Sequence, residues 1–159
     1  MPRPVFLYIG RVAVEKNIGA FLGLDLPGSK VVVGDGPILS RLQREHPDVR
    51  FTGARHGEAL ARAYAGADVF VFPSLTDTFG LVLLESLACG TPIAAYPVTG
   101  PIDVLADAHD KVGAVDYDLR TAALKALTAD RAACRAHAER YSWHACAELF
   151  LSHLVPMTS

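Results

Sequence analysis

The sequence predicts an α/β domain with a doubly wound parallel sheet of about six strands, helices on both faces and a helical C-terminus. Short apolar runs without polar alternation recur along the chain, which is typical of strands covered on both faces. Stretches with helical spacing separate these runs, and such alternation favours a parallel sheet with right-handed crossovers. The length of 159 residues indicates a single domain over residues 1–159.

The six predicted strands are the apolar runs, most of which stop at a glycine or a proline. They cover residues 5–9, 30–33, 49–52, 68–72, 92–96 and 111–115. The predicted helices cover residues 38–44, 58–65, 80–88, 120–128 and 131–140, and a last helix covers 142–154 with Ser142 as its N-cap. Helix 80–88 is apolar nearly all round, which predicts burial, whereas 120–128 and 131–140 have the pattern of exposed surface helices. We expect Tyr141 and Trp143 to pack the last helix on the sheet.

The composition narrows the class of protein. A formal net charge of −2 provides no basic patch for nucleic acid, so no nucleic-acid partner is expected. Three cysteines without a C-x-x-C pair argue against a disulfide framework and favour a reducing compartment. No apolar run approaches the roughly 20 residues that span a bilayer, and the N-terminus lacks a signal-peptide core. We therefore expect a cytoplasmic protein. No metal is expected, since the six histidines form no pair at metal spacing with a nearby acid, and their expected places are the surface and helix ends.

The candidate ligand site lies in the loops after the strands, because ligands of such sheets bind beyond the carboxyl ends of the strands. After the first run, Gly10 lets a ligand approach the backbone closely. Arg11 and Lys16 then place two cations in one short loop, which suits a diphosphate. Two solvated surface charges are the alternative interpretation.

The next two loops also contain glycines. Gly34 and Gly36 flank an acid before Pro37, which could be the first helical residue, so this segment is a tight strand-to-helix turn or a ligand contact. It lacks the third glycine of the dinucleotide-binding pattern. The loop with Gly53 and Arg55 could border a base pocket, although a plain loop before a helix is favoured. The turn at residues 98–101 could shape a sugar pocket or be a plain turn.

The segment 73–85 is the most informative stretch of the chain. A helix begins near Phe79 or Gly80, so the free amides and the positive end of its dipole face the ligand edge. Asp77 precedes this helix. Glu85 is expected on the buried part of the helix, where a carboxylate is costly unless it is bound. Ribose hydroxyls or backbone amides could bind it.

Seven segments carry a resemblance to a known family. They are Gly10-Arg11 with Glu15-Lys16 (G-R-x-x-x-E-K), 34–37 (G-[DE]-G-P), 51–53 (F-x-G), 67–74 (A-D-v-f-v-x-P-S), 77–85 (E-x7-E), 88–92 (A-x-G-x-P) and 141–143 (f-S-W). In order and in spacing they resemble the C-terminal domain of the retaining GT-B glycosyltransferases of family 4, also called glycosyl transferases group 1. The similarity runs from about Tyr8 to about Leu151 and implies the Rossmann-like half of a GT-B fold.

The resemblance implies that the donor substrate is a nucleoside-diphosphate sugar. Arg11 and Lys16 would hold its diphosphate and stabilise the departing nucleotide, with no metal or other cofactor required. The amides of the predicted helix start would bind phosphate and sugar, and they belong to Thr78, Phe79, Gly80 and Leu81. The glycines of the matched turns would line the substrate site, and they are Gly10, Gly34, Gly36 and Gly53.

The resemblance also implies how the sugar and the nucleoside are held. Asp77 would bind a hydroxyl of the transferred sugar, and Glu85 would bind the ribose hydroxyls. The loop with Arg55 would border the base. The first acid of the E-x7-E motif is usually Glu, whereas this sequence has Asp77. The stretch 76–85 is similar to a bacterial subgroup that includes lipid-directed mannosyl and sulfoquinovosyl enzymes, which indicates hexosyl transfer to a lipid or glycan.

Members of this family carry an N-terminal acceptor-binding domain that has no counterpart in this sequence. We therefore expect an acceptor domain, a partner chain or self-association, with apolar surface at Phe150, Leu151 and Leu154. The apolar fraction of 51% agrees with such a surface. A complete enzyme acting on a lipid would associate peripherally with a membrane. Two alternatives stay open: a non-catalytic nucleotide-sugar-binding module that acts with a partner, and a nucleotide-sugar epimerase of GT-B type.

Overall fold

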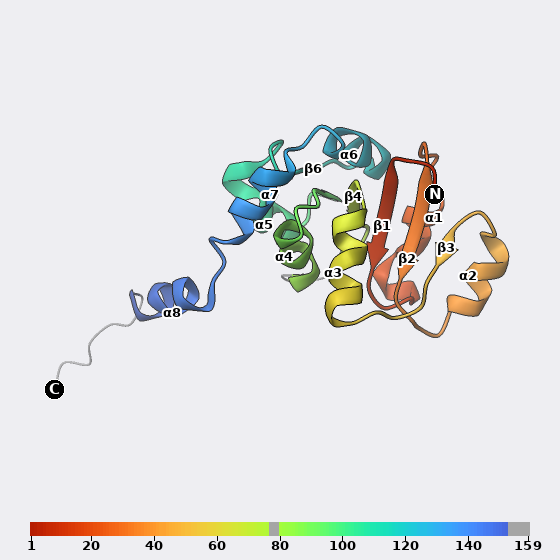
Figure 1. Cartoon of the computed structure of the whole chain (residues 1–159), viewed down its shortest axis with the longest axis horizontal. Helices are drawn as coiled ribbons and strands as arrows, with labels where there is room; N and C mark the ends of the chain where they lie inside the picture. The colour runs from red at the N-terminus through yellow and green to blue at the C-terminus, as the bar shows by residue number, and fades with distance from the viewer. Residues whose placement is uncertain (77–79, 153–159) are drawn as a thin grey trace.

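The computed structural model of the chain describes residues 1–76 and 80–152 and contains one six-stranded parallel sheet (Figure 1). The strand order is β3-β2-β1-β4-β5-β6, and every pair of neighbouring strands is parallel. The order reverses between β1 and β4. This is the doubly wound arrangement that the sequence predicts, with a ligand edge where the chain changes direction.

The elements follow one another in regular alternation. The strands are β1 (Val5–Ile9), β2 (Ser29–Val33), β3 (Arg50–Phe51), β4 (Val69–Phe72), β5 (Ile93–Ala95) and β6 (Gly113–Val115). The helices are η1 (Val14–Lys16), α1 (Ile18–Leu22), α2 (Leu39–Glu45), α3 (Gly57–Gly66), α4 (Leu81–Ala88), α5 (Thr99–Leu105), η2 (Ala106–Ala108), α6 (Leu119–Ala126), α7 (Arg131–Ala138) and α8 (Trp143–Ser152). All six predicted strands are present, and β3 is reduced to two residues at the edge of the sheet.

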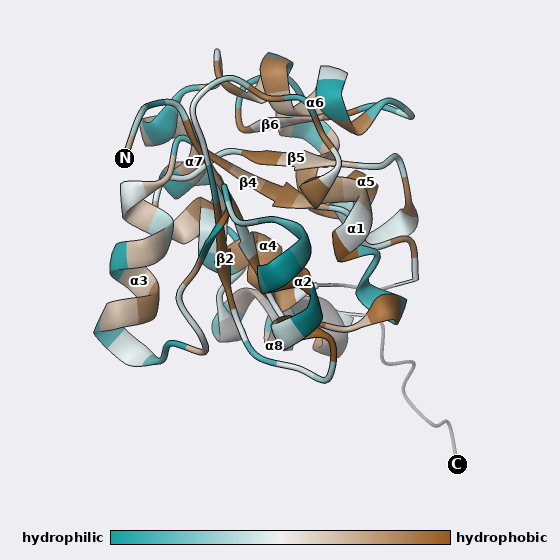
Figure 2. Ribbon diagram, turned by 90° about the vertical axis from the view of Figure 1, so that its right-hand side faces the viewer, coloured by the Kyte–Doolittle hydropathy of each residue, from teal (hydrophilic) through white to brown (hydrophobic). Residues whose placement is uncertain are grey.

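The sheet separates two hydrophobic clusters, because successive strand residues point to opposite faces. On one face Leu7 and Phe70 pack with residues of α3, α4 and α7. On the other face Phe6 and Val71 pack with residues of α1, α2 and α6. Figure 2 shows the apolar strands β4 and β5 lying between these helices. Burial on both faces explains why the strands have no polar alternation.

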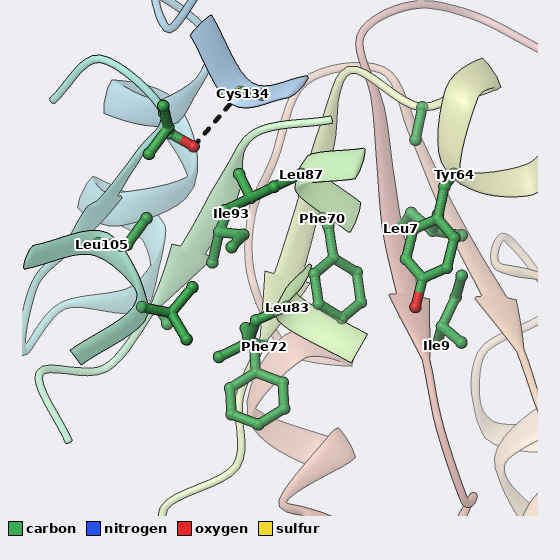
Figure 3. Packing of buried hydrophobic residues seen from close by; sticks show 14 of the residues in the cluster. Leu7, Ile9, Tyr64, Phe70, Phe72, Leu83, Leu87, Ile93, Leu105 and Cys134 are labelled. Carbon is green, nitrogen blue, oxygen red and sulfur yellow. Dashed lines mark hydrogen bonds between the residues drawn. The ribbon is translucent and has the colours of Figure 1, made fainter. Parts of the chain in front are cut away.

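Figure 3 shows the first cluster from close by, with Leu83 and Leu87 of α4 beside Phe70 and Phe72 of β4. Cys134 of α7 is fully buried there, and its thiol donates to the Val112 carbonyl at 3.6 Å. Burial raises the pKa of Cys134 to about 11, so the thiol stays protonated at neutral pH. Cys89 and Cys134 are both free cysteines, as the sequence predicts.

Some helices differ from the expectation. The turn expected at residues 98–101 is the start of α5, and α1 was not predicted at all. Helix α2 begins at Leu39, so Pro37 is not its first residue. Helices α6 and α7 are not simple surface helices, since α6 buries Ala122 against the sheet and α7 buries His137. Alanine-rich helices show no strong apolar stripe in the sequence, which is why their buried faces were missed.

The last helix, α8, lies apart from the sheet in Figure 1, so the expectation that it packs on the sheet is wrong. Tyr141, just before it, stays with the domain: its ring contacts His137, and its hydroxyl lies 3.3 Å from the Val104 carbonyl. Leu151 on α8 is 62% exposed, in agreement with an apolar surface on this helix. Leu154 and the side chain of Phe150 lie outside what the structure describes. Within residues 1–76 and 80–152, no helix has the length and apolar character needed to cross a membrane.

The loops after β1 and β2 approach each other closely at Gly34, and this contact can be tested. A Cβ atom on Gly34 would lie 1.9 Å from the Gly10 carbonyl oxygen, and Gly34 has a φ of +150°. Gly34→Ala should therefore lower the free energy of unfolding by about 2 kcal/mol or more, measured by urea denaturation. Gly19→Ala in α1 is the matched control, because its Cβ would meet nothing within 4 Å. Equal stability of the two variants would contradict the close approach of the loops.

Candidate functional site

The candidate site is built on loops that the backbone itself ties together at the carboxyl edge of the sheet. The Gly10 N–H donates to the Val33 carbonyl at 3.1 Å, and the Val12 N–H donates to the Asp35 carbonyl at 2.9 Å. A Cβ atom on Gly36 would lie 2.2 Å from the Val12 carbonyl oxygen, so the backbones of the two loops are in direct contact. The positions of these loops are therefore fixed without help from a ligand.

Arg11 extends from the first of these loops. The Tyr8 hydroxyl donates to the Arg11 carbonyl at 2.8 Å and fixes the backbone at this position. The guanidinium lies 3.3 Å from the Glu15 carboxylate, and its side chain is 64% exposed. An exposed ion pair of this kind contributes little stability, so Arg11 can exchange Glu15 for a ligand anion at small cost.

Lys16 ends the short helix η1, and Asn17 follows it. Asn17 has a φ of 52°, the left-handed conformation that asparagine and glycine adopt most readily. Its side-chain amide donates to the Pro73 carbonyl at 3.0 Å. This bond joins the turn that carries Lys16 to the loop after β4, which brings two distant segments of the sequence together.

The start of α4 forms the opposite wall. Gly80 is the N-cap residue with a φ of 71°, and its carbonyl accepts from the Leu83 N–H at 2.8 Å. The amides of Gly80, Leu81 and Val82 lie at the helix start, where no turn of the helix precedes them. Together with the helix dipole they favour a negatively charged group at this end of α4.

These parts surround a cleft with two lobes that adjoin at shared residues. The first lobe has a volume of about 320 Å³ and is lined by Tyr8, Ile9, Gly10, Arg11, Lys16, Phe72, Pro73, Ser74, Gly80, Leu81 and Val82. The second lobe has a volume of about 360 Å³ and is lined by Ile9, Gly10, Arg11, Val33, Gly34, Asp35, Ala54, Arg55, His56, Leu60, Val82 and Glu85. Arg11 and Val82 belong to both lobes, so a ligand can extend from one into the other.

Glu85 differs from the expectation in its burial. The sequence predicted a buried carboxylate, but Glu85 is exposed at the second lobe, and the buried face of α4 is formed by Leu83, Ser86 and Leu87. The prediction was wrong because α4 buries one side against the core, and Glu85 lies on the side that meets solvent. One carboxylate oxygen of Glu85 accepts from the Tyr64 hydroxyl at 3.0 Å. Burial, and secondarily the charge of Glu85, raise the pKa of Tyr64 far above its usual range, so the phenol is the donor.

The structure brings most predicted site residues to the cleft. Gly10, Arg11, Lys16, Gly80 and Leu81 line the first lobe, and Gly34, Arg55 and Glu85 line the second. Gly36 and Gly53 line neither lobe. Gly36 contacts Val12, and the Gly53 carbonyl accepts from the Gly34 N–H at 3.0 Å, so both glycines shape the loops from behind. Asp77, Thr78 and Phe79 lie outside the described residues.

Four residues that line the cleft or support its lining were not singled out as site residues from the sequence: Tyr8, Asn17, Tyr64 and Ser74. The signals for Tyr8 and Tyr64 were weak, since both look like ordinary core aromatics. Asn17 had a usable signal, because asparagine after a short turn favours the left-handed conformation. Ser74 is buried in the wall of the first lobe, and its hydroxyl has no hydrogen-bond partner within the described part of the chain.

The described residues of the cleft do not form a cluster of metal ligands. Among residues 1–76 and 80–152, no group of three or more His, Cys, Asp and Glu side chains is arranged to hold a metal ion. Among the described lining residues of the first lobe, the charged groups are Arg11 and Lys16, and the helix start adds a positive dipole end. The arrangement suits an anion with several oxygens, such as a diphosphate.

Comparison with protein-family models gives a match over most of the chain. The model described as Glycosyl transferases group 1 matches residues 3–130. A GDP-mannose-dependent alpha-mannosyltransferase of Mycobacterium tuberculosis is 43% identical over 105 residues, covering 65% of this chain and 28% of the relative. Sulfoquinovosyl transferase SQD2 of Arabidopsis thaliana is 34% identical over 161 residues, covering 90% of this chain and 31% of the relative. The chain thus spans less than a third of the length of these two relatives.

Solved structures share the fold at low sequence identity. The lipopolysaccharide outer core galactosyltransferase WaaB in its apo form has a TM-score of 0.77 at 19% identity, covering 97% of this chain and 50% of that one. The pneumococcal O-GlcNAc transferase GtfA, in complex with UDP and GlcNAc, has a TM-score of 0.71 at 19% identity, covering 95% of this chain and 35% of that one. At this identity the likeness establishes the architecture alone, and the matched part is 50% of the first structure and 35% of the second.

The geometry at Asn17 leads to a prediction about how the Lys16 turn is held. Asn17→Ala removes the bond to Pro73 and places alanine in the left-handed region, whereas Asn17→Gly removes the bond but keeps the backbone relaxed. We expect the alanine variant to be less stable than the glycine variant by about 1 kcal/mol in urea denaturation. A glycine variant as unstable as the alanine variant would mean that the left-handed backbone does not constrain this turn.

Proposed function

Because the chain belongs to the glycosyl transferases group 1 family, and has the fold of a GT-B C-terminal domain, we propose that its cleft binds the donor of a retaining glycosyl transfer. The donor is a nucleoside-diphosphate sugar, and the group transferred is a hexosyl group. The observation that carries the proposal is that Arg11, Lys16 and the start of α4 line one lobe. These groups complement a diphosphate in charge and in hydrogen bonding.

The chemistry of the proposed reaction needs such groups. The bond between the sugar carbon and the β-phosphate oxygen breaks, its electron pair stays on the phosphate, and the acceptor oxygen bonds to the sugar carbon. The acceptor proton leaves with the departing diphosphate. Arg11, Lys16 and the amides of Gly80 and Leu81 stabilise the charge that grows on the leaving phosphate. In this proposal no metal or other cofactor takes part.

The second lobe is the proposed nucleoside site. Glu85 presents a carboxylate that accepts hydrogen bonds from the two ribose hydroxyls, and Arg55 borders the base. Asp77 is the proposed ligand of a sugar hydroxyl. GDP-mannose is the first donor to test, since two of the relatives found are GDP-mannose-dependent mannosyltransferases of Mycobacterium tuberculosis and Corynebacterium glutamicum. A lipid or a glycan is the proposed acceptor class.

The acceptor side of the proposed reaction requires a further component. The two relatives described above are each more than three times the length that matches, and each of the two similar structures contains a further part of at least equal size. We propose that an acceptor domain or a partner chain completes the site, and that α8 with its exposed Leu151 belongs to that contact. By itself the chain is then a nucleotide-sugar-binding module.

Titration calorimetry with GDP, GDP-mannose, UDP and UDP-glucose tests the donor site. Lys16→Ala should weaken binding of the preferred nucleoside diphosphate by about tenfold, because a charge-assisted bond to phosphate is lost. Lys111→Ala, an exposed lysine far from the cleft in the sequence and in the fold, is the matched control and should change nothing. Binding should also weaken at high salt, since Arg11 is exposed to solvent. If none of the four compounds binds, or if both variants bind as the parent chain does, the proposal fails.

Light scattering over a range of concentrations tests the partner surface. We expect the chain to self-associate at high concentration in the absence of its acceptor component, since an unpartnered apolar helix face promotes association. Leu151→Glu should reduce this association, whereas Tyr117→Glu, at an even more exposed apolar position outside α8, should not. A chain that stays monomeric at high concentration would argue against a partner surface on α8.

A further inference from the structure

We propose that Tyr64 is a positioning residue for nucleotide recognition: its buried phenol holds the Glu85 carboxylate in the orientation that accepts the ribose hydroxyls. The inference rests on the proposed function, because it assigns a partner to the carboxylate that meets the nucleoside. The Tyr64 hydroxyl donates to Oε2 of Glu85 at 3.0 Å across the contact between α3 and α4.

Tyr64 is held firmly from several directions. Its side chain is 1% exposed, and its ring packs edge-to-face on Phe70 with the ring centres 5.6 Å apart. Its carbonyl accepts from the Thr91 hydroxyl at 2.7 Å and from the Ala67 N–H at 2.9 Å. Figure 3 shows the ring between α3 and β1, with the hydroxyl pointing toward the end of the sheet at Ile9. The donor is therefore part of the core and does not move with the surface.

Glu85, in contrast, is exposed and has few other restraints. Within the described residues, the ion pairs do not include Glu85, and its other carboxylate oxygen, Oε1, has no hydrogen-bond partner. A glutamate without a partner samples several side-chain rotamers, and a ligand that needs one of them must select it. The bond from Tyr64 selects one orientation in advance. Oε1 and the remaining lone pair of Oε2 stay available to two ribose hydroxyls.

The same two atoms could instead form a contact that only stabilises the fold. The two possibilities differ in their dependence on the ligand. A structural bond affects the binding of every nucleotide equally, whereas a positioning bond affects only ligands with the hydroxyls that Glu85 accepts. A comparison of nucleotides with and without the ribose hydroxyls therefore separates the two possibilities. The variant used can keep the aromatic ring of Tyr64 in the core and remove only its hydroxyl.

The experiment measures dissociation constants of GDP and UDP and of their 2′,3′-dideoxy forms by titration calorimetry. The parent chain should bind the ribonucleotides more tightly than the dideoxy forms. Tyr64→Phe keeps the ring against Phe70 and removes the hydroxyl, and it should weaken the ribonucleotides by about three- to tenfold. It should leave the dideoxy forms within about twofold of the parent chain. In a Glu85→Ala background, Tyr64→Phe should have no further effect, because the carboxylate that it positions is gone.

Tyr141→Phe is the matched control, since it also removes a partly buried tyrosine hydroxyl but lies away from the cleft. It should change no dissociation constant. If the parent chain discriminates against the dideoxy forms and Tyr64→Phe discriminates equally, the positioning role is wrong while the proposed function stands. If Tyr64→Phe weakens all four nucleotides equally, Tyr64 acts through the fold and the inference also fails. If the parent chain binds neither GDP nor UDP, or ignores the hydroxyls, the proposed role of Glu85 fails first and this inference with it.

Discussion

The close approach of two backbone loops at the end of β1 and β2 is the constraint on which the cleft depends. Gly34 stands where any side chain would meet the Gly10 carbonyl, and Gly36 stands in the same relation to Val12. Two backbone hydrogen bonds cross the same contact. This packing brings the loop with Arg11 over the middle of the sheet, beside the start of α4. The absence of side chains at these two glycines therefore allows the backbones of the two loops to come into direct contact.

The site separates the parts that are rigid from the parts that carry charge. Its walls are backbone and buried side chains: the helix start at Gly80, the loop fixed by the Tyr8 hydroxyl, and the turn fixed by Asn17. Its charged groups, by contrast, sit on the surface, and Arg11 has an exposed pairing with Glu15. Side chains in water cost little to rearrange, while the amides of a helix start are oriented before the ligand arrives. Geometric selectivity is therefore expected from the backbone, and charge attraction from the side chains.

The sequence predicted the sheet well because its signal is strong: unbroken apolar runs that end at glycine or proline. It predicted part of the lining of the first lobe, including Arg11 and Lys16, since loops that follow parallel strands meet at one edge. It misplaced Glu85 because an apolar helix shows little contrast between its sides, so the sequence does not reveal which side of α4 meets solvent. It missed the buried faces of α6 and α7 because alanine gives little hydrophobic contrast. The bonds of Asn17 to Pro73 and of Tyr64 to Glu85 join residues 56 and 21 positions apart, which no local pattern reveals.

Helix α4 contributes to both lobes of the cleft and to the core. Its first turn supplies amides to one lobe, its buried side holds Leu83 and Leu87 in the core, and its exposed side carries Glu85 to the other lobe. The helix is set in place from its far end as well, where the Ser86 hydroxyl donates to the Thr91 carbonyl at 2.8 Å and the Thr91 hydroxyl donates to the Tyr64 carbonyl. A displacement of α4 would move both lobes together, because the two walls belong to one rigid element. The spacing between the helix start and Glu85 is thus fixed by helical geometry, which matches a ligand whose anionic and hydroxyl-bearing parts are themselves a fixed distance apart.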